Sequence, residues 1–129
     1  MFPTFFRLIL AAVVAVTLAS CGGTALTQQT ASYTVKLSLD TLAVGDRTIT
    51  VDIADQADKP VKAQQVTLAP TMLSMGMASP EVSLRAEGNG GYSGQKMLLS
   101  MTGEWAIDVK ITSNRGTETA RFLITVPTQ

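Results

Sequence analysis

The sequence predicts an all-β protein, an immunoglobulin-like antiparallel β-sandwich of about seven strands, preceded by a lipoprotein signal peptide. From Tyr33 onward, apolar and polar residues alternate with a period of two, and the apolar sets recur roughly every 8–12 residues. The breaks between the sets are rich in Gly, Asn, Asp and Pro, which favour turns. Two such sheets can bury each other's apolar faces, and a small closed barrel is the alternative fold.

Each expected strand has one apolar face, and no segment after Cys21 shows a sustained helical stripe. In chain order the apolar sets are Tyr33, Val35, Leu37 and Leu39; Ile49, Val51 and Ile53; Val61, Val66 and Leu68; Val82, Leu84 and Ala86; Met97, Leu99 and Met101; Trp105, Ile107, Val109 and Ile111; and Ala120, Phe122, Ile124 and Val126. The turns expected between them are at 42–46, 55–60, 87–91, 102–103 and 113–116.

Two aromatic residues begin expected strands. Trp105 opens a set with strict alternation, so we expect it to anchor the core, and stacking on a ligand is the alternative. Tyr92 follows two glycines, and we expect a core position with its hydroxyl near the rim.

Residues 1–20 are similar to a bacterial lipoprotein signal peptide. Arg7 precedes an apolar run of about ten residues, which is too short for a transmembrane helix of roughly 20. The run ends in Leu18-Ala19-Ser20-Cys21, which resembles a lipobox. The resemblance implies cleavage before Cys21 and diacylglycerol on its thiol, and therefore a lipid anchor on the extracytoplasmic side of a bacterial membrane, in the periplasm or at the cell surface. An ordinary signal peptide with a coincidental cysteine is the alternative.

The mature chain is expected to divide into two parts. Residues 21–32 follow as the lipidated cysteine and a flexible tether, which would place the domain roughly 18 Å from the anchor on average. Residues 33–127 form the folded domain. Gly22 differs from the aspartate of inner-membrane retention signals, which points to the outer membrane where the host has one. With its cysteine used for lipid, the domain has no disulfide and depends on its apolar core.

Composition excludes several classes of function. A length of 129 residues allows one domain. Ten Lys and Arg balance ten Asp and Glu, so there is no electrostatic reason to expect nucleic acid as a partner. The chain has no His, hence no Ser-His-Asp or Cys-His machinery and no usual zinc site, and we expect no enzyme. Asp52, Asp55 and Asp58 recur every three residues, and we interpret them as solvated charges rather than a loop for a hard ion.

Methionine is the unusual feature. Met72, Met75 and Met77 lie in the segment 70–80, which has Pro at both ends and Gly76 inside, so we expect a loop or irregular edge. Three thioether sulfurs within a few residues are soft, neutral donors that suit Cu(I). The alternatives are packing between the sheets and an adaptable interaction surface.

Two further methionines belong to an expected strand. Met97 and Met101 share a face with Leu99, which favours core packing for both. Met101 lies at the end of that strand, from which it could reach a site at the rim.

Several short motifs together resemble the YtkA-like domain, a family of small exported or membrane-anchored bacterial proteins related to the FixH proteins. The motifs are Asp58-Lys-Pro-Val61, Val66-Thr-Leu68, Met72-Leu-Ser-Met-Gly-Met77, Gly90-Gly-Tyr92 and Met101-Thr-Gly-Glu-Trp105. The resemblance covers about residues 33–127 and implies an immunoglobulin-like sandwich with a role in copper handling around membrane oxidases. The family's methionine-rich segment falls on Met72, Met75 and Met77, and its methionine before Gly-x-Trp falls on Met101. The absence of His argues against Cu(II).

The sequence therefore predicts a membrane-anchored carrier or buffer that binds Cu(I) through Met72, Met75, Met77 and Met101, with a membrane oxidase or efflux complex as partner. A metal-free β-sandwich adaptor of such a complex is the alternative.

Overall fold

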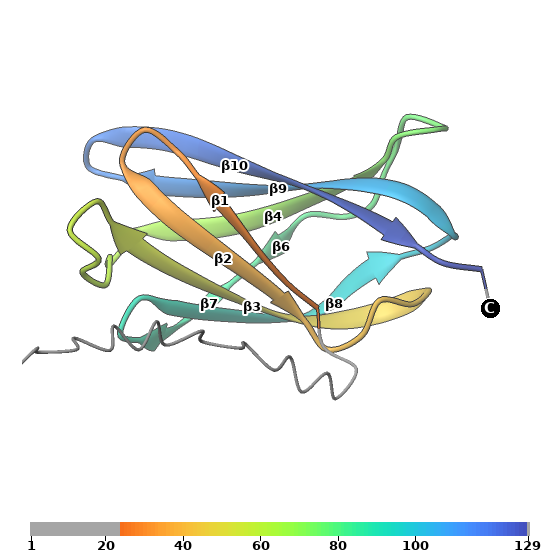
Figure 1. Cartoon of the computed structure of the whole chain (residues 1–129), viewed down its shortest axis with the longest axis horizontal. Coiled ribbons are helices and arrows are strands. Elements are labelled where there is room, and N and C mark those ends of the chain that lie inside the picture. Colours follow the sequence, from red (N-terminus) through yellow and green to blue (C-terminus); the bar gives the residue numbers. More distant parts are fainter. Residues whose placement is uncertain (1–23, 129) are drawn as a thin grey trace, which may run out of the picture.

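The computed structural model describes residues 24–128, which form two antiparallel sheets packed face to face (Figure 1). The first sheet has the order β1-β2-β3-β8-β7, and the second has the order β10-β9-β4-β5, with β6 also paired to β4. Within these residues no helix is long and apolar enough to cross a bilayer. The strands are β1 Thr24–Gln29, β2 Tyr33–Leu39, β3 Gly45–Asp55, β4 Gln65–Met72, β5 Met77–Ala78, β6 Val82–Ser83, β7 Arg85–Gly88, β8 Gly91–Leu99, β9 Gly103–Ser113 and β10 Gly116–Val126.

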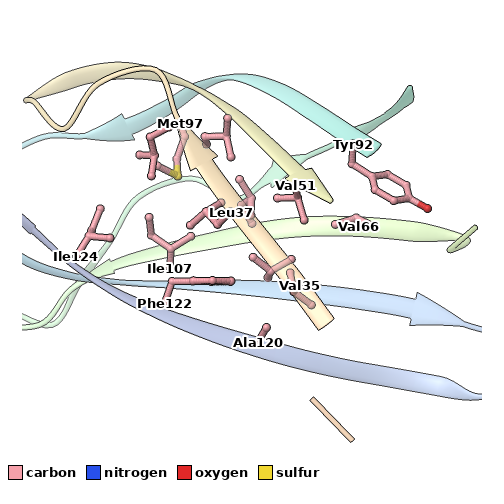
Figure 2. Close-up of a cluster of buried hydrophobic side chains, with 14 of the residues drawn as sticks. Val35, Leu37, Val51, Val66, Tyr92, Met97, Ile107, Ala120, Phe122 and Ile124 are labelled. Atoms are coloured by element: carbon pink, nitrogen blue, oxygen red, sulfur yellow. The ribbon is translucent and has the colours of Figure 1, made fainter. Parts of the chain in front are cut away.

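The predicted β-sandwich is confirmed, and most of the apolar residues read from the alternation form its core. Ala86 and Met101 are instead exposed, and Val61, Val82 and Leu84 are only partly buried. Figure 2 shows side chains of both sheets pointing toward one another, with Leu37 and Val51 from one sheet and Ile107 and Phe122 from the other. These four residues are 0–1% exposed, whereas the residues on either side of Leu37 in β2 are more exposed, because successive side chains of a strand point to opposite faces. Trp105 is 1% exposed, so its predicted role as a core anchor holds.

The first strand was not expected. We predicted a flexible tether over 21–32, but Thr24–Gln29 pair with β2 as an edge strand, in a register that places Thr24 opposite Leu39. Leu26 packs partly against the core, and the rest of the strand is held by its backbone ladder. The apolar residues of this segment, Ala25 and Leu26, are adjacent and show no period, so the alternation did not reveal the strand. Residues 1–20 and Cys21, with the predicted lipid site, lie outside the described residues.

The structure divides some predicted sets differently. The set Val82, Leu84 and Ala86 splits into the short strands β6 and β7, since Leu84 bonds to β4 through its amide while β7 pairs with β8 in the other sheet. Val61 precedes β4 in an irregular segment. The split of the 82–86 set, together with the unexpected strands β1 and β5, accounts for ten strands within residues 24–128 where about seven were expected.

The sandwich has two ends, which differ in chemistry. We call the end with the turns 40–44, 73–76 and 100–102 the methionine end, and the end with the turns 30–32, 56–58, 88–90 and 113–116 the tyrosine end. Figure 1 shows the β4–β5 tip, the β8–β9 turn and the C-terminal end on the same side. The register that aligns the methionine end consists of Thr24 with Leu39, Gly45 with Leu99, Met72 with Trp105, and Gly103 with Val126.

Hydrogen bonds from buried tyrosine hydroxyls hold the tyrosine end. The hydroxyl of Tyr92 donates to the carbonyl of Val61 at 3.0 Å and accepts from the amide of Ala63 at 2.7 Å, as expected for a core residue with its hydroxyl at the rim. Gly90 lies beneath this segment with a φ of +76°, and its carbonyl accepts from the amide of Ile53 at 2.8 Å. A Cβ at Gly90 would lie 2.5 Å from the Ile53 carbonyl oxygen, so only glycine fits.

We expect Gly90→Ala to destabilise the protein more than Gly88→Ala. Both glycines have positive φ, so both variants carry backbone strain of about 1–3 kcal/mol. Only Gly90 adds a steric clash, because nothing lies within 4 Å of a Cβ at Gly88. Denaturant unfolding of the two variants isolates the clash, and equal losses of stability would contradict the close approach.

Glu118 of β10 fixes the turn between β1 and β2. Its Oε1 accepts from the backbone amide of Ser32 at 2.9 Å. Partial loss of hydration raises the pKa of Glu118, but the hydrogen bonds from Ser32 and Thr30 outweigh it and hold the pKa below its ordinary value. The ionised carboxylate therefore ties the edge hairpin of one sheet to the last strand of the other.

The depressed pKa of Glu118 predicts a pH-dependent stability. Its contribution is complete above the pKa of an unfolded glutamate, about 4.3, and disappears as pH falls through the lower folded value. We expect Glu118→Gln to unfold at lower denaturant concentration than the wild type at pH 7, and the two to converge in acid. A difference in midpoint that is independent of pH would show that charge does not matter here.

Candidate metal site

The β4–β5 hairpin carries the three clustered methionines. Met72 ends β4 and Met77 begins β5, and the two are directly opposite each other in the antiparallel register. Met75 lies in the connecting turn, where Gly76 has a φ of +61°. Opposite residues of an antiparallel pair have Cβ atoms about 4.5–5.5 Å apart, so the side chains of Met72 and Met77 leave the sheet on the same face.

The expected loop over 70–80 is thus regular for part of its length. Pro70 is buried within β4, opposite Ile107 of β9. The carbonyl of Pro70 accepts from the amide of Ser79 at 3.0 Å, in the interruption between β5 and β6. In an antiparallel strand the N–H and C=O of one residue point to the same side. The nitrogen of Pro70, which has no hydrogen to donate, therefore faces this interruption, where the sheet does not need a hydrogen bond from it.

The four candidate ligands differ in burial. Met72 is 5% exposed, and its Cε would lie 3.2 Å from a Cβ at Gly103, so the side chain fits closely over that glycine in the core. Met75 is 57%, Met77 48% and Met101 43% exposed. Packing therefore accounts for Met72, whereas the other three thioethers are open to solvent.

Hydrogen bonds tie both the Met101 turn and the β4–β5 hairpin to the start of β9. Strand β8 ends at Leu99, so Met97 is buried as predicted but Met101 lies in the following turn rather than in the core. The indole Nε1 of Trp105 donates to the carbonyl of Met101 at 3.0 Å, and the amide of Leu73 donates to the carbonyl of Glu104 at 3.0 Å. The turns 73–76 and 100–102 are therefore both held to the first residues of β9.

The exposed methionines of this end offer soft sulfur donors. Within residues 24–128, no three His, Cys, Asp or Glu side chains converge on a position for a metal ion. Neutral thioethers at the methionine end fit Cu(I), which prefers sulfur, and do not fit Cu(II), which prefers nitrogen. Met75, Met77 and Met101 are the exposed donors, and Met72 lies in the core beside them.

The three aspartates lie apart from this end. Asp55 Oδ1 accepts from the amides of Ala57 at 2.9 Å and Lys59 at 3.0 Å, and so it shapes the turn after β3. Asp52 and Asp58 are exposed. Asp52 and Asp58 therefore fit the interpretation as solvated charges. Asp55 instead stabilises a turn, which the spacing of the aspartates did not predict.

Sequence reasoning missed two features of the methionine end. One is the indole bond that links Trp105 to the Met101 turn, and the other is the exposure of Leu73 and Val44, at 44% and 41%. The spacing of Met101 and Trp105 carries no signal for the bond, because it depends on how the turn folds back. Both exposed residues lie in the turns of this end.

Truncation of the two neighbouring methionines should give very different results. We expect Met72→Ala to lower the free energy of unfolding by about 2–5 kcal/mol, since it removes a buried side chain. Met75→Ala should change it by less than about 0.5 kcal/mol, since the side chain is exposed. Denaturant unfolding of both variants checks this, and similar costs would show that Met72 is not part of the core.

Comparison with known proteins bears on the family. A structure similar to this one is the crystal structure of a DUF4426 family protein from Pseudomonas aeruginosa PAO1, with a TM-score of 0.52 and 19% identity. The match covers 80% of this chain and 99% of that one, and shows a shared fold. A search of curated proteins found no match. The YtkA-like family model matches residues 27–110, which is more than half of the chain and includes β2–β8 and most of β9. The protein therefore belongs to the YtkA-like family.

Proposed function

We propose that the protein is a lipid-anchored, extracytoplasmic YtkA-like module that binds Cu(I) as cargo, as a carrier or buffer rather than a catalyst. Membership of the family and the sandwich fold fit an accessory module of this kind. The anchor is inferred from the lipobox at 18–21. The metal is inferred from the methionine end.

The observation that carries the copper proposal is the exposure of three thioethers at one end of the sandwich, two in turns and one at the start of β5. A buried methionine is explained by packing, whereas Met75, Met77 and Met101 are each more than 40% exposed and contribute little to the core. Trp105 supports the arrangement by fixing the Met101 turn against the strand that pairs with the hairpin.

Thioether donors suit the proposed compartment. They bind no proton near neutral pH and form no disulfide, so the site would keep its affinity in an acidic or oxidising envelope where thiolates are lost. Neutral sulfur binds less tightly than thiolate, which suits a carrier that must release its ion. The roles would be ligation by Met75, Met77 and Met101, with Met72 as packing beneath them.

We expect replacement of Met75, Met77 and Met101 by Leu to weaken Cu(I) binding by about tenfold or more. Leu keeps the apolar volume and removes the sulfur, so the change is specific to ligation. Affinity is measured by anaerobic competition with a chromogenic Cu(I) chelator.

Met97→Leu is the matched control, because Met97 is fully buried in β8 and should not bind. It should retain wild-type affinity. An unchanged affinity in the triple variant would exclude the proposed ligands, and a loss in Met97→Leu equal to that in the triple variant would point to unfolding instead.

A metal-free adaptor is the second candidate function. It is favoured by Leu73 and Val44, which are exposed at the methionine end and cannot bind metal. Pull-down from membranes with and without a Cu(I) chelator separates the two. A partner retained equally in both conditions supports the adaptor, and one lost with the chelator supports the copper carrier.

A further inference from the structure

Exposed apolar side chains are gathered at one end of the sandwich. Within residues 24–128, the large hydrophobic side chains that are at least 36% exposed are Val44, Leu73, Met75, Met77, Leu98, Met101 and Leu123. Five of these lie in or beside the turns of the methionine end. The other two lie in the same half of the molecule, since Leu98 pairs with Asp46 and Leu123 pairs with Ala106, next to Trp105. The tyrosine end carries none of them.

The described chain also begins at the methionine end. Thr24, the first residue of β1, is opposite Leu39, and Leu39 is opposite Ile49 near the start of β3. Because Thr24–Gln29 form a strand, only two residues, Gly22 and Gly23, separate Cys21 from the fold. The three Cα–Cα steps from Cys21 to Thr24 span at most about 11 Å, which is shorter than the average of roughly 18 Å expected for the whole tether.

We propose that the methionine end faces the membrane and that its apolar side chains contact the lipid surface. This inference rests on the lipid anchor at Cys21 in the proposed function. A reach of about 11 Å from the anchor leaves the methionine end close to the headgroups and keeps the tyrosine end, at the other end of the strands, away from them. Leu73, Met75 and Val44, in turns at this end of the sandwich, are then the side chains that enter the interface.

The charges at this end define the type of lipid contact. Among the residues of this end that the structure describes, Asp46 and Glu104 are exposed, and Asp40 lies near Arg47, with 4.0 Å between carboxylate and guanidinium, so these residues form no basic patch for anionic lipids. The contact is therefore apolar insertion between headgroups rather than electrostatic adsorption. It adds to the lipid anchor a second, weak interaction that orients the domain.

This orientation bears on copper transfer. Met75, Met77 and Met101 lie at the same end as the apolar contact, so a bound ion would be held next to the bilayer surface. The acceptor chemistry that fits is a thioether or thiolate site of a membrane protein at the level of the headgroups.

The test uses the full lipidated protein, whose Cys21 thiol is blocked by lipid. Single cysteines are introduced at Val44 and Leu73 at the methionine end, and at Ala57 and Asn114 at the tyrosine end, all exposed. Each is labelled with an environment-sensitive fluorophore and reconstituted in phosphatidylcholine vesicles that contain a nitroxide-labelled lipid. We expect quenching at positions 44 and 73 to be several-fold greater than at 57 and 114.

Two positions are labelled at each end so that the comparison remains possible if one variant fails to fold. Circular dichroism identifies a variant that is not folded. Equal quenching at both ends, or greater quenching at the tyrosine end, overturns the inference and leaves the Cu(I) proposal intact. No quenching at any position, with the protein still lipidated, also overturns it and favours a protein or a second copy on this end. Mass spectrometry that finds no lipid on Cys21 overturns both the anchor and the inference, while the copper titration stands by itself.

Discussion

Mutual burial of two apolar sheet faces is the interaction on which the structure depends. Among residues 24–128 the core contains no buried charged group and no disulfide, so stability comes from interdigitated Val, Ile, Leu, Phe and Trp side chains. This constraint imposes the period-two pattern on every long strand. It also leaves the turns at both ends free to differ, since they lie outside the buried layer.

The two ends use that freedom in opposite ways. At the tyrosine end, buried hydroxyls and a carboxylate satisfy backbone groups, as in the bonds from Tyr92 to Val61 and from Ser32 to Glu118. At the methionine end, Trp105 connects the core to the surface through the carbonyl of Met101, and side chains without polar partners reach solvent. The tyrosine end is thus stabilised by hydrogen bonds to backbone groups, whereas the methionine end exposes thioether and aliphatic side chains. The proposed copper site and the proposed lipid contact both follow from this asymmetry.

The candidate site was predictable in composition and only partly in arrangement. Soft donors without imidazole point to Cu(I) from residue types alone. The sequence could not separate Met72 from Met75 and Met77, because the point at which β4 ends depends on its pairing with β9 and β5. It could not place Met101 either, since the length of β8 and the indole bond are set by the packing of Trp105. Pro70 led us to expect a loop where β4 continues. The energetic cost of a proline in a strand depends on whether its missing N–H faces a paired neighbour, and the sequence does not show this.

By itself, the sequence determined the fold class and the inward residues of the long strands, because alternation is a local property that every strand with one buried face must show. Its lack of His and its single Cys also limit the side-chain donors of the proposed metal site to methionine sulfur and oxygen. Tertiary structure decided that Thr24–Gln29 form an edge strand, which turns are neighbours, and that the start of the fold and the exposed methionines lie at the same end. These features come from register and from pairing between segments far apart in the chain, and no local pattern encodes them.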